Sequence, residues 1–472
     1  MSRPSTLAEL KTTDYRPRSV KDEMRENAIR MLKSGERIFP GIIGYDDTVI
    51  PQVINAVLAR HDMLFLGLRG QAKTRMLRAL PTLLDESIPV IDGCDVFDDP
   101  LAPLFRSSRA IVEEHGDATP IRWIHRDERY HEKLATPDVT VADLIGEIDL
   151  VKHAEGRYLA DERVMHFGLI PRTNRGIFAI NELPDLAPRI QVAMFNVLEE
   201  RDVQIRGFPI RLPLDLCMVF TANPEDYTNR GRIITPLKDR IGSVVRTHYP
   251  RRSEDGIAIT RENAWIERSN GAMKVDVPGY MFEILEEAIR LARKSPHINQ
   301  QSGVSVRTSI ACCETMISNA ERRAIARRET RVVPRISDLA TIAASCRGKI
   351  ELMLAEDEGA EDKLITALFG EAVKNVFAEY MEPDELDAIV EQFRGGKTDL
   401  QTGDDMRADK LVGQLDRIES LGTAAAELCG KTDRDPDCPA DLAGAAEFIL
   451  EALYVNNRLS KYAYKGKTFF RR

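Results

Sequence analysis

The segment that decides the fold reads FLGLRGQAKTR and spans residues 65–75. It continues the apolar run MLFL of residues 63–66, which is typical of a short buried strand, and leads into RMLRALPTLLDE, which has the spacing of a helix. Gly67 stands six residues before Lys73, and Thr74 follows the lysine directly. This is the pattern of a phosphate-binding loop, in which backbone N–H groups point inward, the lysine reaches the β- and γ-phosphates and the hydroxyl binds Mg²⁺.

The loop departs from the usual pattern at Ala72, because a glycine normally stands directly before the lysine. An alanine with a helical φ is tolerated there, whereas a positive φ costs an alanine on the order of 1 kcal/mol or more. An ordinary strand, turn and helix is the alternative to a nucleotide site. We expect a nucleotide-binding loop formed by Gly67, Arg69, Gly70, Gln71, Ala72, Lys73, Thr74 and Arg75.

Composition and charge narrow the class of protein. The 472 residues allow about two to four domains, and 43% apolar with 30% charged residues is typical of a globular protein. A net charge of −9 argues against a nucleic-acid surface as the main partner. The N-terminus has no apolar signal region, no run of about 18 apolar residues occurs, and the seven cysteines are scattered. We expect a cytoplasmic protein with reduced thiols, no membrane insertion and no nucleic-acid partner.

The pattern along the chain predicts four parts. Residues 1–35 read as a helical arm, and the strands and helices of residues 36–255 predict an α/β domain with a largely parallel sheet. Its strands are MLFL, IPVIDG, GIFAI and LCMVFTAN, and VQIRGFPIRL (residues 203–212) predicts a hairpin. Residues from about 93 to 165 read as a long, charged and irregular insert. Residues 256–350 predict a helical lid domain, and residues 351–472 a C-terminal extension that is helical to the end.

Two polar residues, Asn181 and Glu182, follow the predicted strand GIFAI. Phosphoryl transfer needs a metal-orienting acid and a base at the end of such a strand. Glu182 can polarise an attacking water, although a helix-capping role is its alternative. Asn181 stands where an aspartate is expected, and an asparagine accepts a hydrogen bond from a Mg²⁺-bound water without supplying charge. Asp185 is close in sequence and is a candidate to compensate.

Three further residues complete the candidate site. Asn223 ends the strand LCMVFTAN and can hold the water or the γ-phosphate, although strands often end in asparagine. Arg240, in NRGRIITPLKDRIG, can reach the γ-phosphate of a neighbouring subunit, and a surface salt bridge is its alternative. Arg307 begins a helix in the predicted lid and can couple the lid to the nucleotide. Each residue is a weak signal alone, but chance rarely supplies all of them in this order.

This ordered set resembles the AAA+ ATPases, and within them the group of MoxR proteins and magnesium-chelatase I subunits. The resemblance covers roughly residues 36 to 350. Beyond the general motifs it is carried by DLIGEIDL (residues 143–150), HFGLIPRTNRGIFAINELPDL (166–186), ERDVQIRGFPIRLPLDLCMVFTANPEDY (200–227) and TPLKDRIG (235–242). It implies a P-loop domain with a parallel sheet, followed by a helical lid.

The resemblance also implies a role for each candidate residue. Lys73 and Thr74 take the Walker A positions, Asn181 and Glu182 the Walker B positions, and Asn223 is sensor one. Arg240 becomes the arginine finger that acts across a subunit boundary, and Arg307 becomes sensor two. Ile42 and Ile43, in PGIIGYDD, match the segment that lines the adenine pocket. The departures at Ala72 and Asn181 place the rate and the metal dependence in question more than binding.

The expected ligands are ATP and Mg²⁺, and the expected assembly is a homo-oligomeric ring, commonly a hexamer. The family implies a partner with a von Willebrand A-type domain and a role in remodelling, activating or inserting metal into a target. Two alternative functions remain open and a third is disfavoured. They are a genuine magnesium-chelatase motor, a nucleotide-dependent scaffold with little hydrolysis, and an enhancer-binding transcription activator. The activator would need a GAFTGA-like loop and a helix-turn-helix, and neither is seen.

A metal site in the predicted insert is a further alternative. His125, Glu128, His131 and Glu132 lie close together in HRDERYHEK. We favour a solvated, charged segment for these residues over a metal-ligating cluster.

Overall fold

The computed structural model describes residues 3–148, 165–204, 211–224, 232–268, 273–353, 359–393, 399–464 and 467–471. The chain folds as two compact units, Met1–His248 and Tyr249–Arg472. Each unit has its own hydrophobic core. Within the described residues, no helix is both long enough and apolar enough to cross a bilayer.

A five-stranded sheet forms the centre of the first unit. Its strand order is β11-β1-β10-β7-β4, and every neighbouring pair is parallel. The strands are β1 (Met63–Leu66), β4 (Tyr130–Leu134), β7 (Gly176–Asn181), β10 (Leu216–Ala222) and β11 (Ser243–Arg246). Because all five strands run the same way, their C-terminal ends meet at one edge, which is where open α/β sheets bind ligands.

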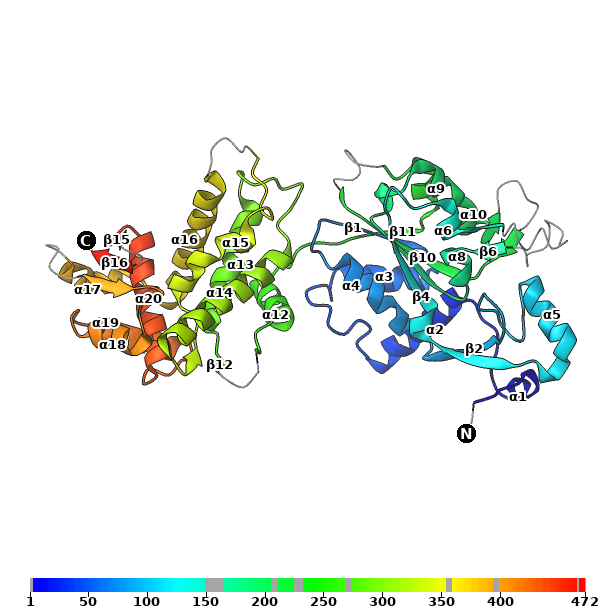
Figure 1. Ribbon diagram of the computed structural model, residues 1–472, viewed down its shortest axis with the longest axis horizontal. Helices are drawn as coiled ribbons and strands as arrows, with labels where there is room; N and C mark the ends of the chain where they lie inside the picture. The colour runs from blue at the N-terminus through cyan, green and yellow to red at the C-terminus, as the bar shows by residue number, and fades with distance from the viewer. Residues whose placement is uncertain are drawn as a thin grey trace. The chain divides into compact units, whose positions relative to one another are not determined.

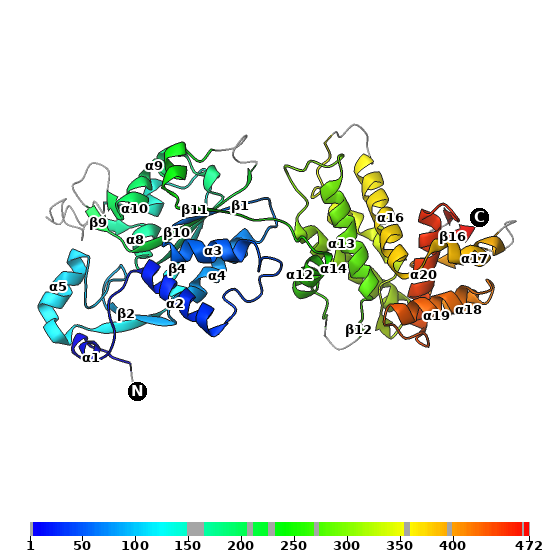
Figure 2. The ribbon, with the colours of Figure 1, turned by 180° about the vertical axis from the view of Figure 1, so that it is seen from behind.

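Helices cover both faces of this sheet (Figures 1 and 2). On one face, strand residues such as Phe65, Ala179 and Val219 pack with α2 (Val20–Ser34), α3 (Val49–Leu58) and α4 (Lys73–Ala79). On the other face, alternate strand residues pack with α8 (Leu169–Arg172), α9 (Pro188–Ala193) and α10 (Phe195–Glu199). Burial on both faces explains why β1, β7 and β10 read as continuous apolar runs. The predicted α/β class with a parallel sheet is confirmed.

Three antiparallel pairs surround the sheet. They are β2 (Ser87–Ile91) with β3 (Ile121–His125), β5 (Gly146–Ile148) with β6 (Met165–Phe167), and β8 (Asp202–Gln204) with β9 (Arg211–Pro213). The pair β8 and β9 provides the two arms of the predicted hairpin, whose residues 205–210 lie outside the described part. The first unit also contains α1 (Leu7–Lys11), α5 (Arg106–His115) and α6 (Val141–Leu144).

The described part of the predicted insert is not irregular. It contains α5, β3, β4, α6 and β5, and β4 is the edge strand of the central sheet. The prediction of an irregular insert was wrong, because the many charged residues of this segment conceal its strands and helices. β4 reads YHEKL, and as an edge strand it is half-exposed, so its polar residues hide the strand pattern.

The second unit is mainly helical. Its helices are α12 (Ser253–Asn263), α13 (Gly279–Lys294), α14 (Val306–Arg327), α15 (Ala343–Cys346), α16 (Ala360–Tyr380), α17 (Asp387–Gln392), α18 (Ala408–Leu415), α19 (Leu421–Lys431) and α20 (Pro439–Val455). α20 is buried along most of its length, and its Phe448 stacks on Tyr280 of α13 with ring centroids 4.7 Å apart. The predicted lid and C-terminal extension therefore share one core, and the boundary near residue 350 stays a prediction.

The second unit also contains short strands. β12 (Lys274–Val275) pairs with β13 (Arg331–Val332), and β14 (Leu400–Thr402) pairs with β16 (Lys467–Arg471), which pairs with β15 (Ser460–Tyr464). The expectation that the chain is helical to its end was wrong. The two strands pair along their whole length, and Tyr462 stacks on Phe469 across them with ring centroids 5.4 Å apart.

Candidate functional site

The segment between β1 and α4 forms a loop whose backbone requires Gly67. A side chain there would collide with the side chains of Thr247 and Gln71. Gly70 has φ 74° and Ala72 has φ 53°, so two residues of the loop adopt the left-handed conformation. Of the two possibilities for Ala72, the structure has the strained one, and the glycine usual at this position would avoid the strain.

Lys73 is 7% exposed, although lysine is rarely buried without a partner. Its Nζ donates to the backbone oxygen of Gly67, to that of Leu68 at 3.0 Å and to Oδ1 of Asn223 at 2.6 Å. The ammonium group therefore lies inside the loop, next to the end of β10. This is the position from which it can reach a bound phosphate.

Asn223 links the lysine to the predicted catalytic acid. Its Nδ2 donates to Oε2 of Glu182 at 2.7 Å. The strand register explains this contact, because Leu66 lies opposite Ala222 and Phe220 lies opposite Ile180, which brings the ends of β1, β10 and β7 side by side. The sequence-predicted residues Lys73, Asn223 and Glu182 thus form one hydrogen-bonded chain across three strand ends.

Glu182 itself has an unusual backbone. Its φ of 56° is left-handed, and its N–H donates to the hydroxyl of Thr221 at 2.9 Å. A non-glycine residue in this conformation costs on the order of 1 kcal/mol or more and is most often found at functional sites. The contact with Thr221 holds the residue in the strained turn, which directs its carboxylate toward Asn223.

These features decide the fold family. A parallel sheet of order β11-β1-β10-β7-β4 carries the lysine loop after β1, the acid after β7 and the asparagine after β10. The chain has the fold of an AAA+ ATPase. The resemblance inferred from the sequence is confirmed at the level of the fold.

Comparisons with known proteins give low similarities. No family model matches the chain. Over 118 residues, or 25% of its length, the chain is 30% identical to the hydrogenase transcriptional regulatory protein HoxA of Cupriavidus necator, and it spans 24% of that protein. A structure of magnesium-chelatase subunits BchI and BchD is 21% identical with a TM-score of 0.37, covering 70% of this chain and 98% of that one. A structure of NtrX of Brucella abortus is 16% identical with a TM-score of 0.37, and the match covers 74% of this chain and 66% of that one.

At these identities and TM-scores the comparisons establish no activity. HoxA is a transcriptional regulator by name, and the local match does not transfer that role to this chain.

Asn181 contacts an acid that the sequence reading did not assign to the site. Its Nδ2 donates to Oε1 of Glu132, and its Oδ1 accepts from the Thr221 hydroxyl at 3.2 Å. Asn181 is 7% exposed. Asp185, the acid expected to compensate for Asn181, is exposed and lies in the turn after Glu182. Glu132 was missed because it lies 49 positions before Asn181 in the segment read as irregular.

Glu132 is one of the four residues considered as a metal cluster in HRDERYHEK. Within the described ranges, no group of three or more His, Cys, Asp and Glu side chains is placed to hold a metal. Because side chains alternate along a strand, Glu132 shares a face with Tyr130 and Leu134, but YHEKL has no apolar alternation that could have identified the strand.

The predicted adenine segment lies close to the phosphate loop. Ile42 is 3% exposed and packs in the core with α2 and α4, and Ile43 is half-buried. The hydroxyl of Tyr45 lies 2.8 Å from the backbone oxygen of Gln71 in the loop and 2.9 Å from that of His248. Tyr45 therefore ties this segment to the loop, as a shared nucleotide site requires.

The hydrogen-bonded chain of Lys73, Asn223 and Glu182 does not include either of the two predicted arginines. Arg240, at the end of α11 (Thr235–Arg240), donates from Nε to Glu199 at 2.6 Å and stacks on Phe195 with 4.7 Å to the ring centroid. Within one chain it therefore forms a surface salt bridge, the alternative considered for it. Arg307 is exposed in the first turn of α14, as predicted, and belongs to the second unit.

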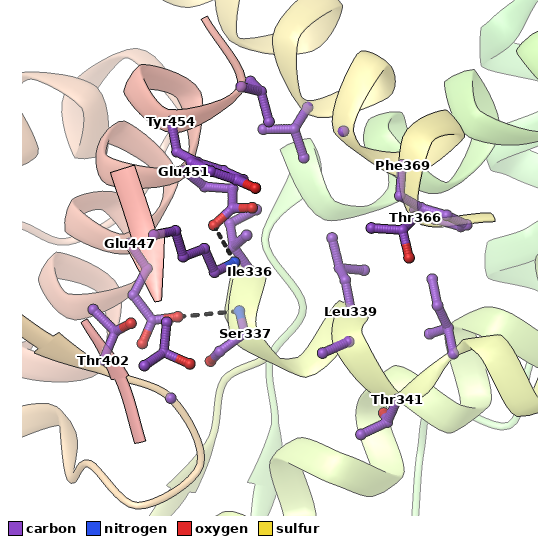
Figure 3. Close-up of a pocket in the computed structure, with 18 of the residues that line it drawn as sticks. Ile336, Ser337, Leu339, Thr341, Thr366, Phe369, Thr402, Glu447, Glu451 and Tyr454 are labelled. Carbon is purple, nitrogen blue, oxygen red and sulfur yellow. Dashed lines mark hydrogen bonds and ion pairs between the residues drawn. The ribbon is translucent and has the colours of Figure 1, made fainter. Parts of the chain in front are cut away.

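The second unit contains a separate cavity of about 430 Å³ between η7 (Ile336–Thr341), α16 and α20 (Figure 3). Its wall is partly apolar, with Leu339 and Phe369. Its charged groups are engaged in pairs or with the backbone, since Glu451 accepts from Lys461 at 2.7 Å and Glu447 accepts from the backbone N–H of Ser337 at 3.1 Å.

Proposed function

We propose that the chain binds ATP with Mg²⁺ at the C-terminal ends of β1, β7 and β10, and hydrolyses the nucleotide. The observation that carries the proposal is the chain of contacts from Lys73 through Asn223 to Glu182. A buried ammonium, an amide and a carboxylate in that order supply a phosphate-binding cation, a group that orients water and a base. The lack of space at Gly67 is consistent with a loop that closes tightly around a phosphate.

The residues present fit a magnesium nucleotide. Mg²⁺, when bound, neutralises charge on the β- and γ-phosphates. The Thr74 hydroxyl and the Asn181 amide oxygen are the groups that would hold it or its water. Lys73 exchanges its backbone contacts for phosphate oxygens, Asn223 orients the attacking water, and Glu182 accepts a hydrogen bond from that water and polarises it.

The proposal extends to a ring. Arg240 can act on a neighbouring subunit's nucleotide only after it leaves Glu199, and this is feasible because both side chains lie at the surface, 28% and 54% exposed. A hexameric ring with Arg240 in trans and Arg307 as a lid contact is the arrangement we propose. In this hypothesis the ring remodels or activates a target protein, or inserts metal into it. It works with a partner that carries a von Willebrand A-type domain, and it does so in the cytoplasm.

A scaffold with little hydrolysis is the second candidate. Two observations favour it, namely the strained Ala72 and the uncharged Asn181. Both reduce catalytic power more than they reduce binding, because Lys73 and the loop remain in place. Measured turnover, rather than nucleotide affinity, separates the two candidates.

The test compares Lys73→Ala with Lys238→Ala, an exchange of a lysine on α11 that lies outside the hydrogen-bonded chain. Binding of a fluorescent ATP analogue and release of phosphate are measured for both variants and the parent. We expect the parent and Lys238→Ala to bind and hydrolyse, and Lys73→Ala to do neither at the same nucleotide concentration. Equal binding by Lys73→Ala and the parent would contradict the proposed site.

A further inference from the structure

Glu132 lies beside Asn181 on one face of the parallel sheet. β4 and β7 pair with Leu134 opposite Asn181, so Glu132 stands two residues earlier and points to the same side. Oε1 of Glu132 accepts a hydrogen bond from the Asn181 amide, while the amide oxygen accepts from Thr221. Contacts from two neighbouring strands therefore fix both ends of the Asn181 side chain.

The Glu132 carboxylate is also held by a cation. Arg78 donates from Nε and NH2 at 2.9 and 3.1 Å, and the Tyr130 hydroxyl donates at 3.1 Å. Burial raises the pKa of the Glu132 carboxyl, but the hydrogen bonds from Arg78 and Tyr130 outweigh it and lower the pKa below its usual range. The Glu132 carboxylate therefore forms an ion pair with the Arg78 guanidinium through two hydrogen bonds.

Helix α4 relates this charge to the candidate metal ligand. Thr74 and Arg78 are four residues apart on α4 and lie on the same helical face. Since Arg78 contacts Glu132, the face that carries Thr74 is turned toward the ends of β4 and β7. The carboxylate absent at position 181 is thus present one strand away, within hydrogen-bond contact of the amide that replaces it.

We propose that Glu132 supplies from β4 the negative charge that Asn181 lacks, and that it positions the Asn181 amide for the metal bound with the nucleotide. This inference rests on the proposed ATP site and deepens it. An aspartate at position 181 would bring two carboxylates into contact, which disfavours ionisation of both. The amide instead donates to Glu132 and keeps a second lone pair on its oxygen for a metal-bound water.

A purely structural ion pair between Arg78 and Glu132 is the competing explanation. The two explanations differ in what the loss of Arg78 does. If the pair is structural, Arg78→Gln and Glu132→Gln harm the site alike. If Glu132 serves the metal, Glu132→Gln weakens Mg²⁺ binding, whereas Arg78→Gln removes a competing positive charge and leaves Mg²⁺ binding unchanged or tighter.

The experiment measures the Mg²⁺ concentration that half-saturates the binding of fluorescent ADP at pH 8. Glu132→Gln is expected to raise this concentration at least about tenfold, the usual effect of losing a partner of a metal ligand. Glu132→Gln combined with Asn181→Asp is expected to return it to within about threefold of the parent, because the carboxylate is restored at the strand end. Glu114→Gln, at an exposed acid on α5, controls for net charge.

The outcomes separate this inference from the proposed function. Binding of ADP without Mg²⁺, in EDTA, tests the loop alone and should be the same in all variants. Equal weakening by Glu132→Gln and Arg78→Gln, or a double variant no better than Glu132→Gln, would overturn the role of Glu132 and leave the ATP site intact. A parent that binds no ADP under any condition would overturn both. If Glu132→Gln fails to fold, Glu132→Asp keeps the charge and should keep the Mg²⁺ response.

Discussion

Replacement of Ala72 by glycine is expected to stabilise the first unit, even though it removes a side chain. Ala72 has φ 53° and ψ 17° and is exposed. The left-handed conformation costs a non-glycine residue about 1–2 kcal/mol. Glycine avoids this strain but loses about 0.5–1 kcal/mol more conformational entropy on folding. The difference predicts a gain of up to about 1.5 kcal/mol in the free energy of unfolding, with no loss of buried area.

Ala79→Gly is the matched control, because Ala79 ends the same helix with φ −87°. There the glycine relieves no strain, and the Ala79 methyl packs against the core, so at least about 0.5–1 kcal/mol should be lost. Urea unfolding is followed by the fluorescence of Trp123, in a Trp265→Phe background that removes the tryptophan of the second unit. Trp265 is 65% exposed, so its replacement should be mild. A loss of stability in Ala72→Gly equal to that in Ala79→Gly would refute the left-handed conformation of Ala72.

Three further changes have defined outcomes. Burial raises the pKa of Glu286 to about 7, so the unfolded chain releases this proton first as pH rises. The free energy of unfolding that Glu286 contributes should therefore fall by at most about 3 kcal/mol between pH 4.5 and 8. Urea unfolding at several pH values should show this decrease in the parent and not in Glu286→Gln. The side chains of Arg129 and Glu23 form a buried ion pair and are 1% and 4% exposed. Arg129→Met leaves the Glu23 carboxylate buried without its cation, so it should lower the free energy of unfolding by about 3–5 kcal/mol. A loss below about 1 kcal/mol in urea unfolding would contradict this cost. Gly67→Ala should abolish binding of fluorescent ATP, because the loop has no room for a Cβ; unchanged affinity would show that the loop opens freely.

The strand-end residues of the site were predictable from the sequence. Lys73, Glu182 and Asn223 each follow an apolar run, and parallel strands bring such positions to one edge regardless of the intervening chain. The partner of Asn181 was not predictable in the same way. Glu132 lies inside the edge strand YHEKL, whose residues are mostly polar and only partly buried, so the segment resembles a loop in composition.

Backbone conformation was also beyond the sequence. Ala72 stands where a phosphate-binding loop usually has glycine, so the sequence leaves the sign of its φ open. The left-handed φ values at Ala72 and Glu182 depend on how the loop and the strand ends pack. The contact of Arg240 with Glu199 could not be predicted either, because it depends on how α11 packs against α10 in the folded chain. The C-terminal strands were missed because they are only three to five residues long and follow a long series of helices.

The most direct test of the account is the release of phosphate from Mg²⁺–ATP by the purified protein and by Glu182→Gln, with nucleotide binding measured in the same samples. The site predicts that both proteins bind ATP through the loop and Lys73, and that only the parent releases phosphate at a measurable rate. Parent protein that is saturated with ATP and Mg²⁺ at high protein concentration and releases no phosphate would contradict hydrolysis. Release at equal rates by both proteins would contradict the role of Glu182.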